Sequence, residues 1–492
     1  MCDTFVAMQN YTANKSIIFA KNSDREPDEV HELIHYPTKE YKEGERVKCT
    51  YIEIPQVRKT YEVILAKPFW IWGCEMGVNE NGVVIGNEAI FTKIPHEKKK
   101  GLIGMDLMRL ALERSKNSGM AVEVIADLLN KYGQGGICGY RNKKMKYHNS
   151  FLIADFDSAK VMECYGKEWA VKEIKDAYSI SNCISIEDDY DYNSDNFGEY
   201  AKSKNWISRE RIKGYEKLNP KEVYTSHLFT HFSGAKKRRN RSFELMNKEK
   251  GKLDVLKIAN ILRDHFLDKN PQVINPCSTC LAKVFISDIL NEVSKRNKKY
   301  HPSYGSNFDI CMHAANSIIR KSQTTGSMIV ELTKDKKILI YATGTSAPCI
   351  SIFKPLFLGY NKIPTENYHT GKFYDEKSIW WRHEKLHRLF LANYKKFIKE
   401  YSHERNELEK EFITESTKFV TKNAKLKYYT KDEIYKFSLS CFKRAQDFTD
   451  RWIDKLSKIK RKKIFFYTNY WDRLSKRNRL LQTFSSPPAY EK

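Results

Sequence analysis

The chain contains 492 residues, of which 41% are hydrophobic and 30% are charged, as is usual for a globular protein. A chain of this length can bury a sizeable core and is too long for a disulfide miniprotein. No stretch approaches the roughly 18 consecutive apolar residues that a transmembrane helix requires, so we expect no integral membrane protein. The formal net charge of +25 fits a polyanion-binding protein, a membrane-surface protein or simply a lysine-rich composition, and does not choose among them.

The first two predicted elements are strands at residues 4–8 and 16–20, which a polar turn joins into a hairpin. Periodicity then predicts further strands and three helices along the first 342 residues. The strands lie at residues 62–66, 83–90, 150–155, 160–164, 169–174, 178–184, 327–332 and 337–342, and the helices at residues 105–114, 121–132 and 255–267. Strands followed by helices and then by strands indicate an α+β layered fold with antiparallel sheets.

From residue 380 onward, apolar residues recur three and four positions apart, which predicts a helical C-terminal region. Two polar segments earlier in the chain, the acidic residues 187–196 and the basic residues 235–241, are expected to be exposed loops.

The positive charge is concentrated in the C-terminal quarter. Residues 371–492 contain 30 basic and 16 acidic residues, a net charge of +14. The densest basic run, residues 458–463, precedes five aromatic residues between positions 465 and 471. Such side chains can bind nucleic-acid phosphates and bases, but a solvated helix face above a hydrophobic stripe has the same pattern. We favour the helix face and expect no nucleic-acid partner.

The 11 cysteines and the N-terminus bear on the compartment and on metal binding. The chain opens without a positive segment followed by an apolar one, so we expect no signal peptide, and we predict a cytoplasmic protein with reduced thiols. Cys277 and Cys280 form a single CxxC pair, to which Cys311 and His313 add only a weak complement. The sequence therefore favours buried or loop thiols and predicts no metal.

Cys2 carries the most informative chemistry. Removal of Met1, which is expected before a small residue, would leave a thiol and a free α-amine on one residue, and the amine can accept the thiol proton near neutral pH. If the hairpin turns near residues 12 and 13, the numbers of paired residues sum to about 25 or 26, which places Cys2 opposite Ser23 or Asp24. Spacing alone is also compatible with an incidental cysteine and a turn aspartate.

Several blocks of the sequence resemble the secernins and the cysteine dipeptidases related to them. In chain order from residue 2 to residue 388, the blocks are CDTFVA, FAKNSDREPDEV, GCEMGVNENGVVIGNEA, CMHAA, SQTTGS, GTSAPC and WWRHEKLHR. The resemblance implies an N-terminal nucleophile hydrolase, whose fold is a four-layer αββα sandwich of two antiparallel sheets between helices. It also implies a hydrolase domain over residues 1–368, followed by a basic helical region over residues 369–492.

The resemblance further implies roles for individual residues. Cys2 matches the nucleophile, and Asp24 matches the residue that binds its α-amine. Asn182 matches one oxyanion-hole asparagine, although a turn asparagine is also compatible with its position. Asn87 is a candidate for the second oxyanion donor, at a spacing that differs from that in the related amidases. Lys21 stands where those amidases carry an arginine, so the charge is kept without the bidentate fork.

A later arginine of the related amidases corresponds to Arg239 or Arg241, within a basic cluster that fits a solvated loop equally well. Together these residues predict a cysteine-dependent hydrolase of small amide or peptide substrates, most of all a dipeptidase, with no cofactor. The alternative is a secernin-like binding or regulatory protein linked to secretion, with weak or absent hydrolysis. Polyanion binding by the basic C-terminal region is a third and weaker alternative. A homo-oligomer is compatible with each of these.

Overall fold

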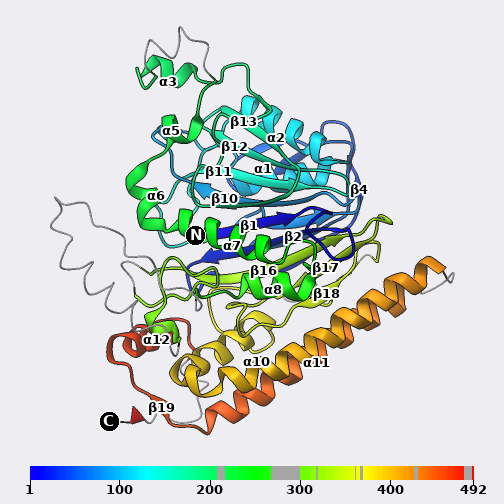
Figure 1. The fold of residues 1–492 in the computed structure, drawn as a ribbon, viewed down its shortest axis with the longest axis vertical. Coiled ribbons are helices and arrows are strands. Elements are labelled where there is room, and N and C mark those ends of the chain that lie inside the picture. The colour runs from blue at the N-terminus through cyan, green and yellow to red at the C-terminus, as the bar shows by residue number, and fades with distance from the viewer. Residues whose placement is uncertain are drawn as a thin grey trace.

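Two antiparallel sheets lie face to face, with helices outside each of them, in the computed structural model of the protein (Figure 1). The structure describes residues 1–207, 217–266, 300–316, 320–360, 362–365, 370–425, 430–480 and 490–491. Cys277 and Cys280 lie outside the described residues, as does the domain boundary expected after residue 368.

The first sheet has six strands and contains the predicted N-terminal hairpin. Its order is β14-β1-β2-β16-β17-β18, and all neighbouring strands are antiparallel. The strands are β1 (Cys2–Ala7), β2 (Ile17–Arg25), β14 (Ala177–Ser181), β16 (Gln323–Leu332), β17 (Ile338–Ala342) and β18 (Lys354–Leu356). In the hairpin Cys2 pairs with Ser23 and Asp3 with Asn22, so the predicted register is confirmed.

The second sheet has eight antiparallel strands in the order β15-β13-β12-β11-β10-β9-β8-β3. The strands are β3 (His31–Tyr36), β8 (Val63–Pro68), β9 (Met76–Asn79), β10 (Val84–Ile90), β11 (His148–Ala154), β12 (Ala159–Tyr165), β13 (Glu168–Ile174) and β15 (Tyr192–Asn193). The sequence patterns predicted five of these strands but not β3, β9 or β15. Residues 187–196 are therefore not only loop, because β15 adds an edge strand beside β13.

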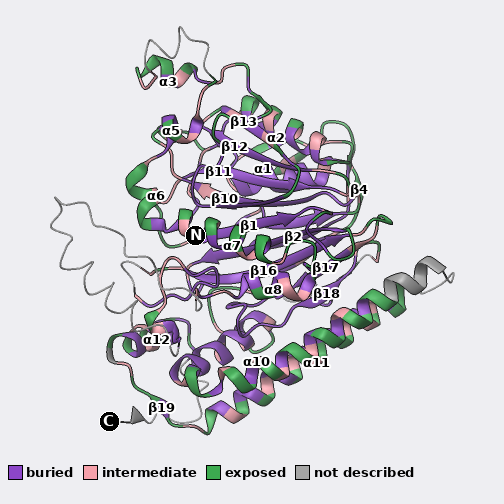
Figure 2. Cartoon of the chain, viewed as in Figure 1, coloured by how far each residue is buried: buried purple, intermediate pink, exposed green. Residues whose placement is uncertain are grey.

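Apolar side chains between the sheets form the central core, in which Val6 and Phe19 face Val84 and Leu152. Helices α1 (Gly104–Arg114) and α2 (Ser118–Tyr132) cover the outer face of the eight-stranded sheet, and α7 (Ala235–Lys248) and α8 (Val255–Leu262) cover that of the six-stranded sheet. Most strands of the two sheets are buried on both faces, as Figure 2 shows, whereas the edge strand β15 is exposed. These layers form the four-layer αββα sandwich that the family resemblance implied, and they confirm the α+β fold with antiparallel sheets that the sequence patterns predicted.

The chain continues into a helical region after β18, as predicted. Helix α10 (Ile379–Lys425) is interrupted at Asn393, whose φ is −129°, and α11 (Lys431–Ser457) lies alongside α10 and also contacts β18 (Figure 1). Helix α12 (Phe465–Arg477) follows. None of the helices among the described residues is long and apolar enough to cross a membrane.

Short elements complete the described chain. They are the helices α3 (Glu199–Ser203), α5 (Pro220–Tyr224) and α6 (His227–Ser233), a 3-10 turn (Pro302–Tyr304), and the strands β4 (Lys39–Glu40), β5 (Arg46–Lys48), β6 (Glu53–Pro55), β7 (Lys59–Thr60), β19 (Arg461–Lys462) and β20 (Tyr490–Glu491).

The basic segment of residues 235–241, expected as an exposed loop, is the first half of α7 and buries Arg238 and Arg241. The helix can bury these arginines because each meets a carboxylate, Asp3 for Arg238 and Asp264 for Arg241. The expectation of a solvated loop is therefore wrong for this segment.

The close approach of the two sheets near Cys2 requires a glycine. A Cβ atom at Gly86 of β10 would lie 2.7 Å from Cδ of Lys21 and 2.9 Å from Cζ of Phe19, both on the facing strand β2. We expect Gly86→Ala to lower the free energy of unfolding by about 1–3 kcal/mol, because the added methyl group overpacks this contact. Urea unfolding followed by circular dichroism measures the change.

Gly119→Ala, in the first turn of α2, is the matched control. Among the described residues beyond its chain neighbours and its own helix backbone, the only heavy atom that its Cβ would meet within 4 Å is Oδ1 of Asn117, at 3.4 Å. We expect this variant to be as stable as the wild type or more stable by up to about 1 kcal/mol, since alanine is the better helix former. Equal destabilisation by the two substitutions would contradict the packing argument.

Candidate active site

Cys2 begins β1 and lies at the end of the hairpin, where only 6% of its surface is exposed. Its Sγ accepts the backbone N–H of Asp24 at 3.3 Å, so the thiol lies at the end of β2 as well as of β1. Burial raises the pKa of the Cys2 thiol to about 12, and the positive charge of Lys21 offsets part of that rise. While Met1 is retained, the thiol is therefore protonated at neutral pH.

Asn182 holds the backbone nitrogen of Cys2. Its Oδ1 accepts the N–H of Cys2 at 2.8 Å and also accepts Nη2 of Arg238 at 2.7 Å. Only the oxygen of an amide can accept two donors, so these contacts orient the side chain. Nδ2 donates to the carbonyl of Ala89 at 3.0 Å, and its second N–H has no acceptor within the part of the chain that the structure describes.

Asp24 ends the neighbouring strand and has a carboxylate that is only half satisfied. Its Oδ1 accepts the hydroxyl of Thr324 at 2.6 Å, whereas its buried Oδ2 has no hydrogen-bond partner among the described residues. Burial raises the pKa of Asp24 to about 7, against the opposing effect of the positive N-terminus. The α-ammonium of Met1 donates to the carbonyl oxygen of Asp24 at 3.1 Å. The residue can therefore bind a cationic amine at this end of the sheet.

The arginine that reaches this site is Arg238, not Arg239 or Arg241. Its guanidinium lies fully buried, with Nε 2.9 Å from Oδ2 of Asp3 and Nη2 3.4 Å from the carbonyl of Cys2. Arg239 instead donates to the carbonyl of Ser179 at 2.8 Å, and Arg241 pairs with Asp264 at 2.8 Å.

The helical phase of α7 explains why Arg239 differs from Arg238. The α7 residues that face the sheet recur three and four apart, at Ala235, Arg238, Arg241 and Ser242. A helical spacing test on the basic segment would have favoured Arg238 and Arg241 over Arg239, and only the fold shows that Arg238 is the one that meets Asp3 and Asn182.

Lys21 crosses from the six-stranded sheet to the eight-stranded one. Its buried Nζ donates to the carbonyl of Asn87 at 2.8 Å and lies 3.1 Å from Oε1 of Glu88. Burial raises the pKa of Glu88 to about 7, and the charge of Lys21 opposes that rise. Lys21 thus provides a positive charge near the Cys2 thiol, but its ammonium group donates hydrogen bonds to residues of the opposite sheet.

Asn87, on β10, is buried within the same sheet interface. Its Nδ2 donates to Oδ1 of Asn149 at 3.0 Å, and its Oδ1 has no hydrogen-bond partner among the described residues. The structure thus brings Cys2, Asp24 and Asn182 together. Lys21 lies on the same sheet as Cys2 and reaches across to Asn87 and Glu88 of the facing sheet, and Arg238, rather than Arg239 or Arg241, lies at the site.

Two further features of the sequence concern metal and nucleic acid. Among the described residues, His265, Cys311, His313 and Cys349 bring metal-ligating atoms together, in a group that does not include Cys2. Of the aromatic residues after the basic run, Tyr467 and Trp471 are buried in an apolar cluster beneath α12. These two rings therefore form the hydrophobic stripe that the helix interpretation predicted.

Comparison with known proteins adds a family. The profile of peptidase family C69 matches residues 1–407. Among solved structures, the C2A mutant of conjugated bile acid hydrolase from Clostridium perfringens matches with 12% identity and a TM-score of 0.36, over 70% of this chain and 88% of that one. Penicillin V acylase from Agrobacterium tumefaciens matches with 15% identity and a TM-score of 0.38, over 75% of this chain and 89% of that one. At these TM-scores neither similarity supports a conclusion about activity. The fold described above rests on the observed strands and helices alone.

The buried thiol leads to a pH prediction for the chain that retains Met1. Only the thiolate reacts with iodoacetamide, so the alkylation rate of Cys2 should rise about tenfold per pH unit from pH 8 to pH 10 without levelling off. Mass spectrometry of the N-terminal peptide measures the rate. In urea the same thiol should level off near its ordinary pKa of about 8.5. A plateau below pH 9 in the folded chain would refute the effect of burial.

Proposed function

This chain belongs to peptidase family C69, and from that premise we propose that it is a cysteine-dependent hydrolase of small amides or peptides, with dipeptides as its main substrates. The observation that carries the proposal is the placement of Cys2: its nitrogen is bound by Asn182 and its Sγ lies beside Asp24. Removal of Met1 would turn this nitrogen into an α-amine without moving it. Nucleophile and base would then belong to one residue.

The chemistry follows from the groups around that residue. The α-amine takes the proton of the Cys2 thiol, and the thiolate attacks the substrate carbonyl carbon to form a tetrahedral oxyanion. The remaining N–H of Asn182 would donate to the oxyanion, a type of contact worth about 3 kcal/mol. Nδ2 of Asn87 donates to Asn149 and to Sδ of Met105, at 3.5 Å, so Asn87 would have to exchange the weak sulfur contact for the oxyanion. The C–N bond then breaks, and the ammonium returns its proton to the leaving amine.

The thioester is hydrolysed in the second half of the reaction. Water loses a proton to the α-amine and attacks the thioester carbonyl; the C–S bond breaks, and the thiol is restored as the acid leaves. Asp24, with its partnerless Oδ2, would favour the ammonium form of the amine at the stages where the amine holds the proton. Arg238 would act as a positioning residue through Asn182.

A cavity of about 360 Å³ is lined by Glu26, which follows Asp24 by two residues in the chain, and Cys2 itself is not among its lining residues. The charged residues that line it are Glu26, Asp28, Arg141, Lys321, Arg473 and Arg477. Four cations against two carboxylates favour a ligand with a negative end. The free carboxylate of a dipeptide has that charge, and a cavity of this size suits a small substrate.

The mechanism predicts that Met1 is absent from the active protein and that Cys2→Ala abolishes hydrolysis. Intact-mass spectrometry checks the first point, and turnover of a dipeptide panel checks the second, with an expected fall in kcat of at least about a thousandfold. Cys49→Ala, which removes another buried thiol, should keep full activity.

Each outcome of this experiment is decisive. Turnover that persists in Cys2→Ala, or activity in a chain that retains Met1, would reject the mechanism. Absence of turnover by the wild type as well would favour a binding or regulatory role for the same fold.

The cavity predicts how the enzyme distinguishes charged from neutral substrates. Arg473, exposed on α12, would attract the substrate carboxylate, so Arg473→Ala should raise KM for dipeptides several-fold and leave kcat unchanged. Lys476→Ala removes an exposed cation of the same helix that does not line the cavity, and should leave KM unchanged. Steady-state kinetics with dipeptides and their C-terminal amides measures the effect. An equal loss for acids and amides would contradict it.

A further inference from the structure

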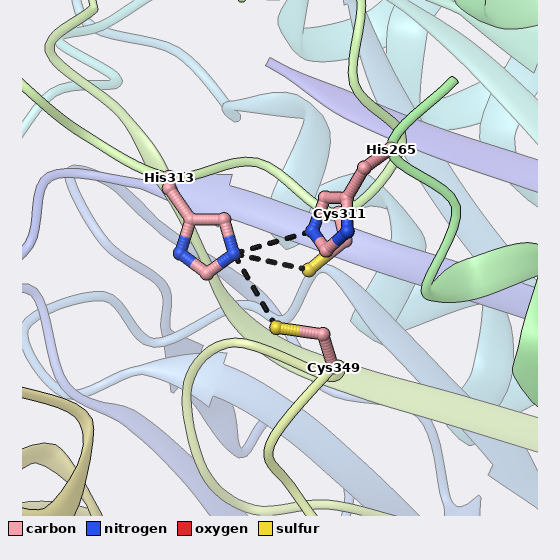
Figure 3. Close-up of side chains that lie close together, drawn as sticks. All are labelled: His265, Cys311, His313 and Cys349. Atoms are coloured by element: carbon pink, nitrogen blue, oxygen red, sulfur yellow. Dashed lines mark hydrogen bonds between the residues drawn. The ribbon is translucent and has the colours of Figure 1, made fainter. Parts of the chain in front are cut away.

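Four buried side chains with soft ligand atoms converge behind the six-stranded sheet. His265 follows α8, Cys311 and His313 lie in the segment before β16, and Cys349 follows β17. Their side chains point toward one another from three separate segments (Figure 3). Each is buried, and the four ligand atoms lie within 4.8 Å of one another.

Hydrogen bonds alone do not account for this arrangement. Nε2 of His313 lies 3.3 Å from Nε2 of His265, 3.6 Å from Sγ of Cys311 and 3.4 Å from Sγ of Cys349 (Figure 3). A ring nitrogen carries either one proton or one lone pair, so it can make only one strong hydrogen bond in this direction. A cation between the four atoms would be bound by all of them.

The distances fit a tetrahedral ion. Bonds of about 2.0–2.1 Å from zinc to nitrogen and about 2.3 Å from zinc to sulfur separate two nitrogens by about 3.3 Å, and nitrogen from sulfur by about 3.5–3.6 Å. The three distances from His313 are 3.3, 3.6 and 3.4 Å, in agreement with those values. Two histidines and two cysteines are also a common ligand set of structural zinc.

Residues around the four side chains fix the orientation of the ligand His313. Nδ1 of His313 lies 3.4 Å from Nε2 of His387, whose Nδ1 lies 3.2 Å from Oε2 of Glu384. Arg388 pairs with Glu384 at 2.9 Å. A chain from carboxylate to histidine fixes the ring orientation of a ligand, leaving its Nε2 lone pair for the ion. All three supporting residues lie on α10, which thereby braces the cluster.

We propose that His265, Cys311, His313 and Cys349 bind one Zn²⁺ ion in a closed structural site. Binding releases the two thiol protons, and the two thiolates neutralise the charge of the ion, which suits a buried position. Four protein ligands leave no coordination position for substrate. This reverses the expectation of no metal, which rested on an isolated CxxC pair. The four ligands that the structure brings together are instead spread over the chain, and the first and last of them, at residues 265 and 349, are 84 positions apart.

Hydrogen bonds also connect the proposed zinc site to Asp24, the residue beside Cys2. Met312, between two ligands, donates its N–H to Oγ1 of Thr324 at 3.0 Å, and the same hydroxyl donates to Asp24 at 2.6 Å. Ala347, two residues before Cys349, donates its N–H to the carbonyl of Thr324 at 2.8 Å. Zinc would therefore fix the two segments that hold Thr324, and through it the carboxylate of Asp24.

Metal analysis of the purified full-length chain tests the proposal directly. Elemental analysis by inductively coupled plasma mass spectrometry should find about one zinc ion per chain, both in the wild type and in Cys2→Ala. Replacement by Co²⁺ should give the visible bands of tetrahedral cobalt together with near-ultraviolet thiolate-to-cobalt charge transfer. These spectra do not depend on activity. A wild-type chain that stays free of zinc after incubation with zinc and reductant would overturn the site.

Variants identify the ligands. Cys349→Ser and Cys311→Ser should lose the ion, whereas Cys441→Ser, which alters a buried thiol of the same apolar cluster, should keep it. The double variant Cys277→Ser/Cys280→Ser should also keep it. Loss of zinc from that double variant or from Cys441→Ser, or a Cys311–Cys349 disulfide in the native protein, would reject the proposal. Chelation should lower the melting temperature of the wild type but not that of folded Cys349→Ser.

Discussion

One amide oxygen, Oδ1 of Asn182, holds the N-terminal site together. It accepts the nitrogen of Cys2 and the guanidinium of Arg238, and so connects β1, the end of β14 and helix α7. The arginine is stable in this buried place because Asp3 pairs with it, and removal of either partner of such a pair costs about 3–5 kcal/mol. The position of the Cys2 nitrogen therefore depends on a charged pair that does not contact the thiol.

The second charged pair joins the two sheets. Lys21 and Glu88 are fully buried on facing strands, close to where Gly86 leaves room for the lysine stem. An arginine at position 21 could bind a carboxylate with two parallel hydrogen bonds, but a lysine gives only a compact charge. In this chain that charge is directed at Glu88 and the carbonyl of Asn87, and it affects the Cys2 thiol through space rather than by contact.

Local patterns predicted what is local, including the fold class and the register that pairs Cys2 with Ser23. They did not predict β3, because its sequence HELIHY mixes polar and apolar residues, and its histidines and glutamate find their partners only after folding. The choice of Arg238 over Arg239 needed the helical phase of α7, which charge alone hides. The cluster around His313 could not be predicted from the sequence, because its ligands come from three segments that come together only when the sheet has assembled.

Cys2 and the pair Cys311 and Cys349 lie in different surroundings, which suit different roles. Cys2 lies at an end of β1 where a backbone nitrogen and an unsatisfied carboxylate oxygen are both held in place, which suits chemistry. Cys311 and Cys349 lie among histidines whose outer nitrogens are already braced, which suits a closed metal site. Thr324 joins the two: its hydroxyl accepts from the ligand-bearing segment and donates to Asp24. Because a hydroxyl has one proton, the N–H of Met312 directs that proton toward the carboxylate, so the cluster helps to position Asp24 beside Cys2.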